Sequence, residues 1–136
     1  METTTLQNDL LVYCITASSF PEGVKQAHER LHALVPFDEK RKYFGLSWPA
    51  ADGRILYKAA AAELHPGEFS KHDLETKVIS KGEYLFIDVY DFMKDIPAIG
   101  NAFQQLIHDS RIDPAGFCIE WYMKMDLCRC MMKMKG

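Results

Sequence analysis

No apolar run in this 136-residue sequence approaches the roughly 20 residues that a membrane-spanning helix requires. The first ten residues are polar and acidic, unlike the basic and then apolar start of a signal peptide. The formal net charge is −3, so the chain has no excess of positive charge with which to attract nucleic acid. We therefore expect a soluble, cytoplasmic protein that contacts neither a membrane nor nucleic acid directly.

The four cysteines of the chain do not suggest a disulfide framework: Cys14, Cys118, Cys128 and Cys130. All of them lie in strand-like runs rather than in loops, so reduced thiols are expected. Cys128 and Cys130 would share one strand face, where two soft ligands could bind Cu(I). No second Cys or His pair accompanies them, and we expect them to line an apolar core. The sequence predicts no metal and no cofactor.

Hydrophobic residues make up 48% of the chain and charged residues 26%, as in an ordinary globular domain. At this length one domain with a substantial core is expected. We predict that residues 1–136 form it, with its core over about residues 10–134.

Hydrophobic periodicity and turn residues divide the chain into two similar parts. Helices are expected to begin near Pro21 and near Pro97, 76 residues apart, since proline favours the first turn of a helix. The run Ala59–Ala62 has helical propensity, but small residues also suit a strand on which a helix packs closely. Gly82 is expected to bend one long strand. Strands are predicted over residues 10–16, 42–48, 54–63, 78–90, 117–124 and 127–133.

This order is a β-α-β-β unit that occurs twice, which indicates an internal duplication. The predicted fold class is therefore α+β, with an antiparallel sheet curved into a barrel-like shell and two helices packed outside it. A pseudo-twofold axis would run between the halves. A cleft at that axis is a natural ligand site.

A lone carboxylate, Glu120, lies in the apolar and aromatic run Phe117–Tyr122. Alternate residues of a strand share a face, so Glu120 lies with Cys118 and Tyr122, and neither face is typical of a solvated surface. A carboxylate in this position is costly unless it is protonated, paired, or neutralised by a cationic ligand. The alternative to a ligand is an Arg or Lys partner at the rim of the sheet.

Three parts of the sequence match one family in order and spacing: Lys42–Ser47 followed by Gly53–Tyr57, then Ile79–Tyr84, and finally Phe117–Tyr122. Over about residues 10–134 the chain resembles the gyrase-inhibitor-like effector-binding domains, which also form the sensor half of AraC-type and multidrug-sensing transcription regulators. The resemblance implies a pocket for lipophilic, often cationic molecules between the two halves, with Glu120 at its centre. Both expected helices belong to the fold, so we expect a stand-alone sensor without a DNA-binding domain.

The predicted function is therefore the binding of a small lipophilic organic ligand, cationic or aromatic. Glu120 would supply the charge and Tyr122 a hydroxyl and a ring. Aromatic side chains would add cation–π energy of roughly 0.5–2 kcal/mol each. A second copy of the chain and a separate regulatory protein are left open as partners. The expected walls of the pocket are Phe44, Trp48, Tyr84 and Tyr90.

An enzyme is the main alternative. The family resemblance extends to members that hydrolyse strained cyclopropane-bearing compounds with a pocket glutamate and an aromatic hydroxyl. Here Glu120 would direct a water molecule and Tyr122 would assist the leaving group. Asp88, Asp91 and Asp95 could join this acid–base work, although acids just before a helix favour its N-terminus instead. A protein-binding module with an exposed apolar patch is a further alternative.

The segment His28-Glu29-Arg30-Leu31-His32 fits the zinc-protease pattern, with two histidines four residues apart on a helix. No third ligand follows downstream, and both histidines border the apolar stripe of the helix. We therefore interpret the motif as a chance match on an amphipathic helix.

Overall fold

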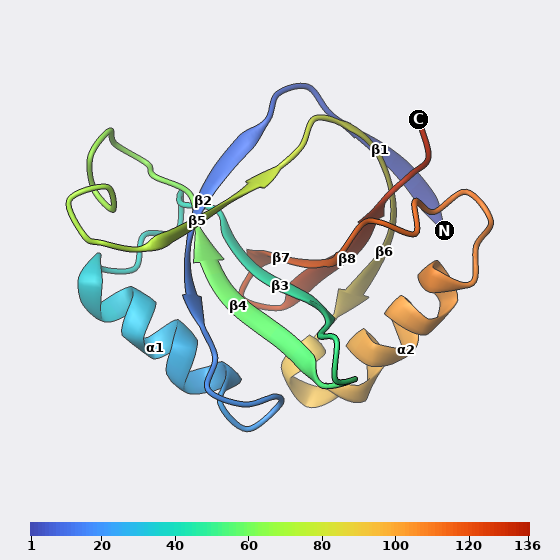
Figure 1. Ribbon diagram of the computed structural model, residues 1–136, viewed down its shortest axis with the longest axis horizontal. Coiled ribbons are helices and arrows are strands. Elements are labelled where there is room, and N and C mark those ends of the chain that lie inside the picture. The colour runs from blue at the N-terminus through green and yellow to red at the C-terminus, as the bar shows by residue number, and fades with distance from the viewer.

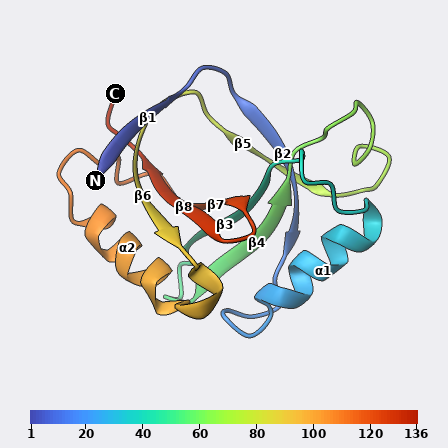
Figure 2. The same ribbon diagram turned by 180° about the vertical axis from the view of Figure 1, so that it is seen from behind.

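The computed structural model describes residues 1–136 as one eight-stranded antiparallel sheet that curls around its inner face (Figure 1). Two helices, α1 (Val24–Leu34) and α2 (Pro97–Ile107), pack outside the sheet, and a short 3₁₀ helix, η1 (Phe92–Lys94), precedes α2. Seen from behind, the helices again lie to either side of the central strands (Figure 2). The strands are β1 (Glu2–Leu6), β2 (Leu10–Thr16), β3 (Tyr43–Pro49), β4 (Ile55–Ala61), β5 (Glu75–Ile79), β6 (Gly82–Tyr90), β7 (Cys118–Lys124) and β8 (Leu127–Lys133).

The sheet order, β1-β6-β8-β7-β3-β4-β2-β5, reveals the duplication. Each half has the order β-β-α-β-β, and β3 and β7 pair at the middle of the sheet. The first strand of each half crosses to the other half, so that β1 pairs with β6 and β5 pairs with β2. The α+β class, the duplication and the curved antiparallel sheet are confirmed. Neither helix is long and apolar enough to cross a membrane.

Each half has one more strand than the predicted β-α-β-β unit. The threonine-rich β1 was not predicted, because it lacks the apolar alternation of a strand that packs on a core. It forms an edge strand, in which Leu6 alone packs against the core cluster on the inner face of the sheet. The expected strand over 78–90 is instead two strands, because β5 and β6 pair with different halves of the sheet. Gly82, with a φ of +134°, begins β6 in a conformation that favours glycine.

Alanines in β4 are strand residues, as predicted, and they explain how closely α1 approaches the sheet. Ala59 and Ala61 are fully buried, and they pack in one core cluster with Ala27 and Leu31 of α1. The second outer core lies under α2, where Cys128 and Cys130 pack with Phe103 and Leu106. The prediction that these two cysteines line an apolar core is confirmed, and all four cysteines are free thiols.

Candidate functional site

Glu120 lies at the middle of the sheet, where the two halves meet. It pairs across β7 and β3 with Gly45, and the next pair along these strands is Trp121 with Phe44. Paired residues of antiparallel strands share a face, and neighbouring pairs alternate. Phe44 and Trp121 pack against the inner core, so Glu120 and Gly45 face outward, toward the side covered by the helices. Tyr122 shares this outer face, as the alternation of the strand predicted.

Four side chains from three elements form a continuous series of hydrogen bonds at this position, which we call the polar chain. His28 Nε2 of α1 lies 2.8 Å from the Tyr57 hydroxyl of β4. The Tyr57 hydroxyl lies 2.8 Å from the Tyr122 hydroxyl, which donates to Glu120 Oε1 at 2.8 Å. The polar chain joins the two halves of the molecule, because Tyr122 and Glu120 belong to the second half and the other two residues to the first.

Gly45 gives the polar chain its space. A Cβ atom built at this position would lie 2.7 Å from Tyr57 Cζ and 2.9 Å from the Tyr122 hydroxyl oxygen. Both distances are shorter than ordinary van der Waals contacts, which begin near 3.4 Å. The glycine is therefore required by close approach, and any side chain here would push the two tyrosines apart.

The Glu120 carboxylate has no cationic partner. The ion pairs of the molecule join other residues, and the hydrogen bond from Tyr122 is the one that Glu120 accepts. Burial raises the pKa of Glu120 to about 7, and the Tyr122 hydrogen bond opposes that rise less strongly. Protein atoms crowd the carboxylate, yet its side chain keeps partial contact with solvent. Glu120 is therefore a partly exposed acid whose charge changes near neutral pH.

Burial also fixes the charge of the other members of the polar chain. It raises the pKa values of Tyr57 and Tyr122 well above 10, so both hydroxyls stay protonated at neutral pH. It lowers the pKa of His28 to about 4, with a smaller contribution from His32, so His28 is neutral. No member of the polar chain supplies a positive charge to Glu120.

Aromatic rings surround the polar chain. Phe20, which is 42% exposed, stacks on Tyr57 with ring centres 5.9 Å apart. Phe92 of η1 lies over Tyr122 at 5.8 Å, and the His28 ring meets the Tyr122 ring edge-on at 5.4 Å. Aromatic rings from both halves thus pack against the two tyrosines of the polar chain.

Four of these contributors were not predicted from the sequence: Phe20, His28, Tyr57 and Phe92. Tyr57 occupies an alternating position of a predicted strand, but its face depends on a register that sequence alone does not give. His28 belongs to the zinc-protease-like segment, yet it serves the polar chain rather than a metal. His32 packs elsewhere, against the rings of Phe37 and Tyr43, and no group of His, Cys, Asp or Glu side chains suits a metal ion.

The predicted pocket walls do not surround Glu120. Phe44 and Tyr84 are buried in the inner core, and Trp48 packs against the same core, on the other face of the sheet. Tyr90, at the end of β6, is 67% exposed. The physical reason is that both faces of this sheet are covered. Aromatic residues therefore occur at the strand positions that point to the inner face as well as at those that point to the outer face.

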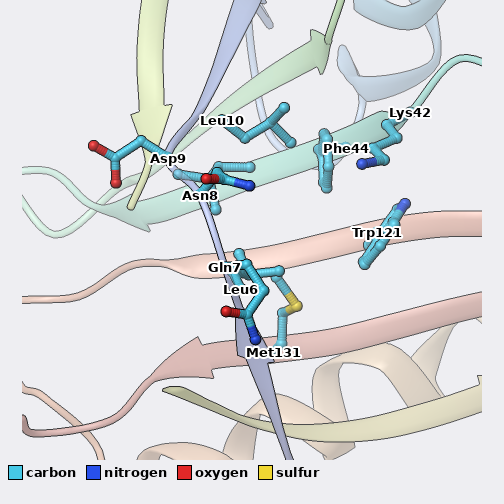
Figure 3. A pocket seen from close by; sticks show the side chains of 10 residues that line it. Leu6, Gln7, Asn8, Asp9, Leu10, Lys42, Phe44, Trp121 and Met131 are labelled. Atoms are coloured by element: carbon cyan, nitrogen blue, oxygen red, sulfur yellow. The ribbon is translucent and has the colours of Figure 1, made fainter. Parts of the chain in front are cut away.

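Phe44 instead lines a cavity of about 390 Å³ on the inner face, between the β1–β2 connection and Trp121 (Figure 3). Tyr84 lines a second inner cavity of about 240 Å³. Neither cavity includes Glu120. Ligand contacts by Phe44, Trp48, Tyr84 and Tyr90 stay a prediction, and the structure separates these residues from the carboxylate.

The aspartates considered for acid–base work lie apart from the polar chain. Asp88 pairs with Arg129 through two hydrogen bonds of 2.8 and 3.1 Å. Asp91 and Asp95 flank η1 and are exposed.

Comparison with known proteins identifies the architecture. No family model matches the sequence, and no curated protein matches it. The solved structure of SAV2435 bound to tetraphenylphosphonium superimposes with a TM-score of 0.71 at 14% identity, covering 99% of this chain and 93% of that one. The fold is the gyrase-inhibitor-like one. The resemblance expected from the sequence is therefore confirmed at the level of the fold.

Two further structures share this fold. An integron cassette protein from the mobile metagenome of Vibrio cholerae gives a TM-score of 0.72 at 12% identity, over 98% of this chain and 95% of that chain. A protein of Staphylococcus aureus MU50, named as a candidate for bacterial transcription regulation, gives 0.64 at 16% identity, over 99% and 97%.

Proposed function

We propose that this chain binds a lipophilic organic cation at the outer face of β7, with Glu120 as its counter-charge. The observation that carries the proposal is a carboxylate that protein atoms crowd, that accepts a hydrogen bond from Tyr122, and that no Arg or Lys neutralises. Because the desolvation of Glu120 is not offset within the protein, a cation that approaches it gains attraction that a paired carboxylate could not offer.

Two interactions would hold the ligand. Opposite charges 4 Å apart attract by about 4 kcal/mol at the effective dielectric constant of a protein surface. Each aromatic face adds roughly 0.5–2 kcal/mol when it meets the cation. A lipophilic cation suits this arrangement best, since its spread charge is weakly hydrated and its apolar groups can cover the exposed ring of Phe20.

The comparison with SAV2435 supports the ligand class, because that protein has this fold and was solved with a lipophilic aromatic cation. The Staphylococcus aureus neighbour supports a regulatory setting. We accordingly propose that the chain acts as a small-molecule sensor that reports to a separate regulatory partner.

Titration with tetraphenylphosphonium tests the proposal. We expect saturable binding by the unmodified chain and a loss of affinity of at least about tenfold in Glu120→Gln, which keeps the shape and removes the charge. Glu29→Gln, on the exposed side of α1, removes one negative charge without touching the site and should bind like the unmodified chain. Equal affinities in Glu120→Gln and Glu29→Gln would overturn the role of Glu120.

A hydrolase is the second candidate, and one observation favours it. An acid with a pKa of about 7, hydrogen-bonded at 2.8 Å to a protonated tyrosine, is a suitable acid–base pair for neutral pH. Glu120 would deprotonate a water molecule that opens a strained electrophilic ring, and Tyr122 would protonate the leaving atom. The test is incubation with a cyclopropane-bearing electrophile: a product heavier by one water, lost in Glu120→Gln, would support turnover, and unchanged substrate would reject it.

A further inference from the structure

The polar chain can satisfy every hydrogen bond in two opposite directions. When Glu120 is a carboxylate, His28 Nε2–H donates to Tyr57, Tyr57 donates to Tyr122, and Tyr122 donates to the carboxylate. When Glu120 is a carboxylic acid, its own O–H donates to Tyr122, and the series runs back to an unprotonated His28 Nε2. A hydroxyl has one donor and two acceptor sites, and a neutral imidazole has one nitrogen of each kind, so the same heavy-atom positions serve both states.

We propose that a cation binds at Glu120 in exchange for a proton, and that Tyr122, Tyr57 and His28 position the acid for this exchange. The inference deepens the proposed function and depends on it. The step balances as follows: the carboxylic acid and the cation give a carboxylate–cation pair, and one proton passes to solvent. The partly exposed His28 forms the end of the polar chain opposite Glu120, and the 2% exposed Tyr57 lies between them.

No other group near Glu120 can supply the compensating charge. From β7 the titratable neighbours are Cys118 and Tyr122, from β4 Tyr57, from β8 Cys128 and Cys130, and from α1 His28. The facing residue of β3 is Gly45, and the eleven residues of α2 include no titratable side chain. Burial raises the pKa of Cys118 to about 11, so this thiol stays neutral. A cation that binds here therefore meets Glu120 either as a carboxylic acid, which must release its proton, or as a carboxylate, which has already released it.

Isothermal titration of tetraphenylphosphonium, in buffers of different ionisation enthalpy, measures the protons released. Because Glu120 has a pKa of about 7, we expect about half a proton per ligand at pH 7, nearly one at pH 5.5 and nearly none at pH 9. The affinity should fall about tenfold per pH unit below pH 6. Binding without proton release at pH 5.5 would overturn the exchange and leave the proposed function intact, whereas no binding at any pH would overturn the proposed function itself.

Variants of His28 test the positioning. His28→Phe leaves the Tyr57 hydroxyl without a donor in the carboxylate state and without an acceptor in the acid state. Because these two losses differ in cost, the midpoint of proton release should move by about half a pH unit or more. His28→Gln keeps a nitrogen that can donate and should restore the original midpoint. Circular dichroism confirms that each variant is folded. An unchanged midpoint in His28→Phe would show that His28 has no positioning role, and a shift that His28→Gln does not restore would assign the effect to packing instead.

Discussion

Gly45→Ala is the substitution that tests the geometry of the site most severely. The new methyl group would lie 2.7 Å from Tyr57 Cζ and 2.9 Å from the Tyr122 hydroxyl oxygen. The Tyr57 hydroxyl oxygen would lie closer still, and ordinary contact begins near 3.4 Å, so Tyr57 must move by more than about 0.7 Å or the backbone must shift. A movement of this size lengthens a 2.8 Å hydrogen bond beyond the range in which it contributes fully.

The expected cost has two parts. Overpacking of a buried position costs about 1–3 kcal/mol. A broken hydrogen bond in the polar chain adds about 1 kcal/mol. We therefore expect Gly45→Ala to lower the free energy of unfolding by about 2–4 kcal/mol and to weaken the binding of tetraphenylphosphonium.

Urea unfolding followed by circular dichroism measures the stability, and Gly100→Ala is the matched control. Gly100 lies in α2 with open space around it, so the same added methyl group should stabilise the helix by up to about 1 kcal/mol. Gly45→Ala with stability within about 0.5 kcal/mol of the unmodified chain, and with unchanged binding, would refute the packing argument at the centre of the sheet.

Three further predictions concern stability. Tyr57→Phe should cost about 1–3 kcal/mol in urea unfolding because His28 Nε2 loses its partner and the Tyr122 hydroxyl keeps only its bond to Glu120, whereas Tyr13→Phe should cost little; equal effects would contradict this. The pKa of Glu120 is raised on folding, so its stabilising contribution is complete below about pH 4.5 and is lost as pH rises through about 7. Glu120→Gln should therefore become more stable than the unmodified chain at pH 8, by about 1–3 kcal/mol, and an unchanged difference from pH 5 to pH 8 would refute this. The hydrogen bonds from Arg41 lower the pKa of Glu68 to about 2, so its contribution is complete above about pH 4.5 and is lost as pH falls toward 2. Glu68→Gln should lower the melting temperature at pH 7 more than Glu29→Gln does, and equal melting temperatures would contradict the importance of the Arg41–Glu68 pair.

The sequence was sufficient to predict the duplicated fold and the strand on which Glu120 lies. Amphipathic helical patterns and alternating strands repeat along the chain, although Pro97 opens α2 and Pro21 lies in the turn before α1. Local pattern also determines that Glu120 shares a face of β7 with Tyr122. Local pattern could not predict that β5 and β6 separate, because their partners lie far away in sequence. It also could not predict β1, whose threonines lack an apolar alternation and are held by the edge of β6.

The aromatic side chains near the polar chain could not be predicted from the sequence, because their positions also depend on long-range strand pairing. Phe44 and Tyr57 both lie in predicted strands, and only the register places Gly45, rather than Phe44, opposite the acid. A shift of the β3–β7 register by one residue would have placed Phe44 opposite Glu120 instead of Gly45. His28 approaches from a helix whose angle to the sheet depends on the buried alanines of β4, a feature of packing rather than of local pattern.

The central claim is that Glu120 is a carboxylate without a partner that accepts a cation. The most direct measurement is the dissociation constant of tetraphenylphosphonium at pH 8, where the acid is charged, for the unmodified chain and for Glu120→Gln. We predict binding that is weaker by at least about tenfold in Glu120→Gln. Equal dissociation constants in the two proteins would contradict the account.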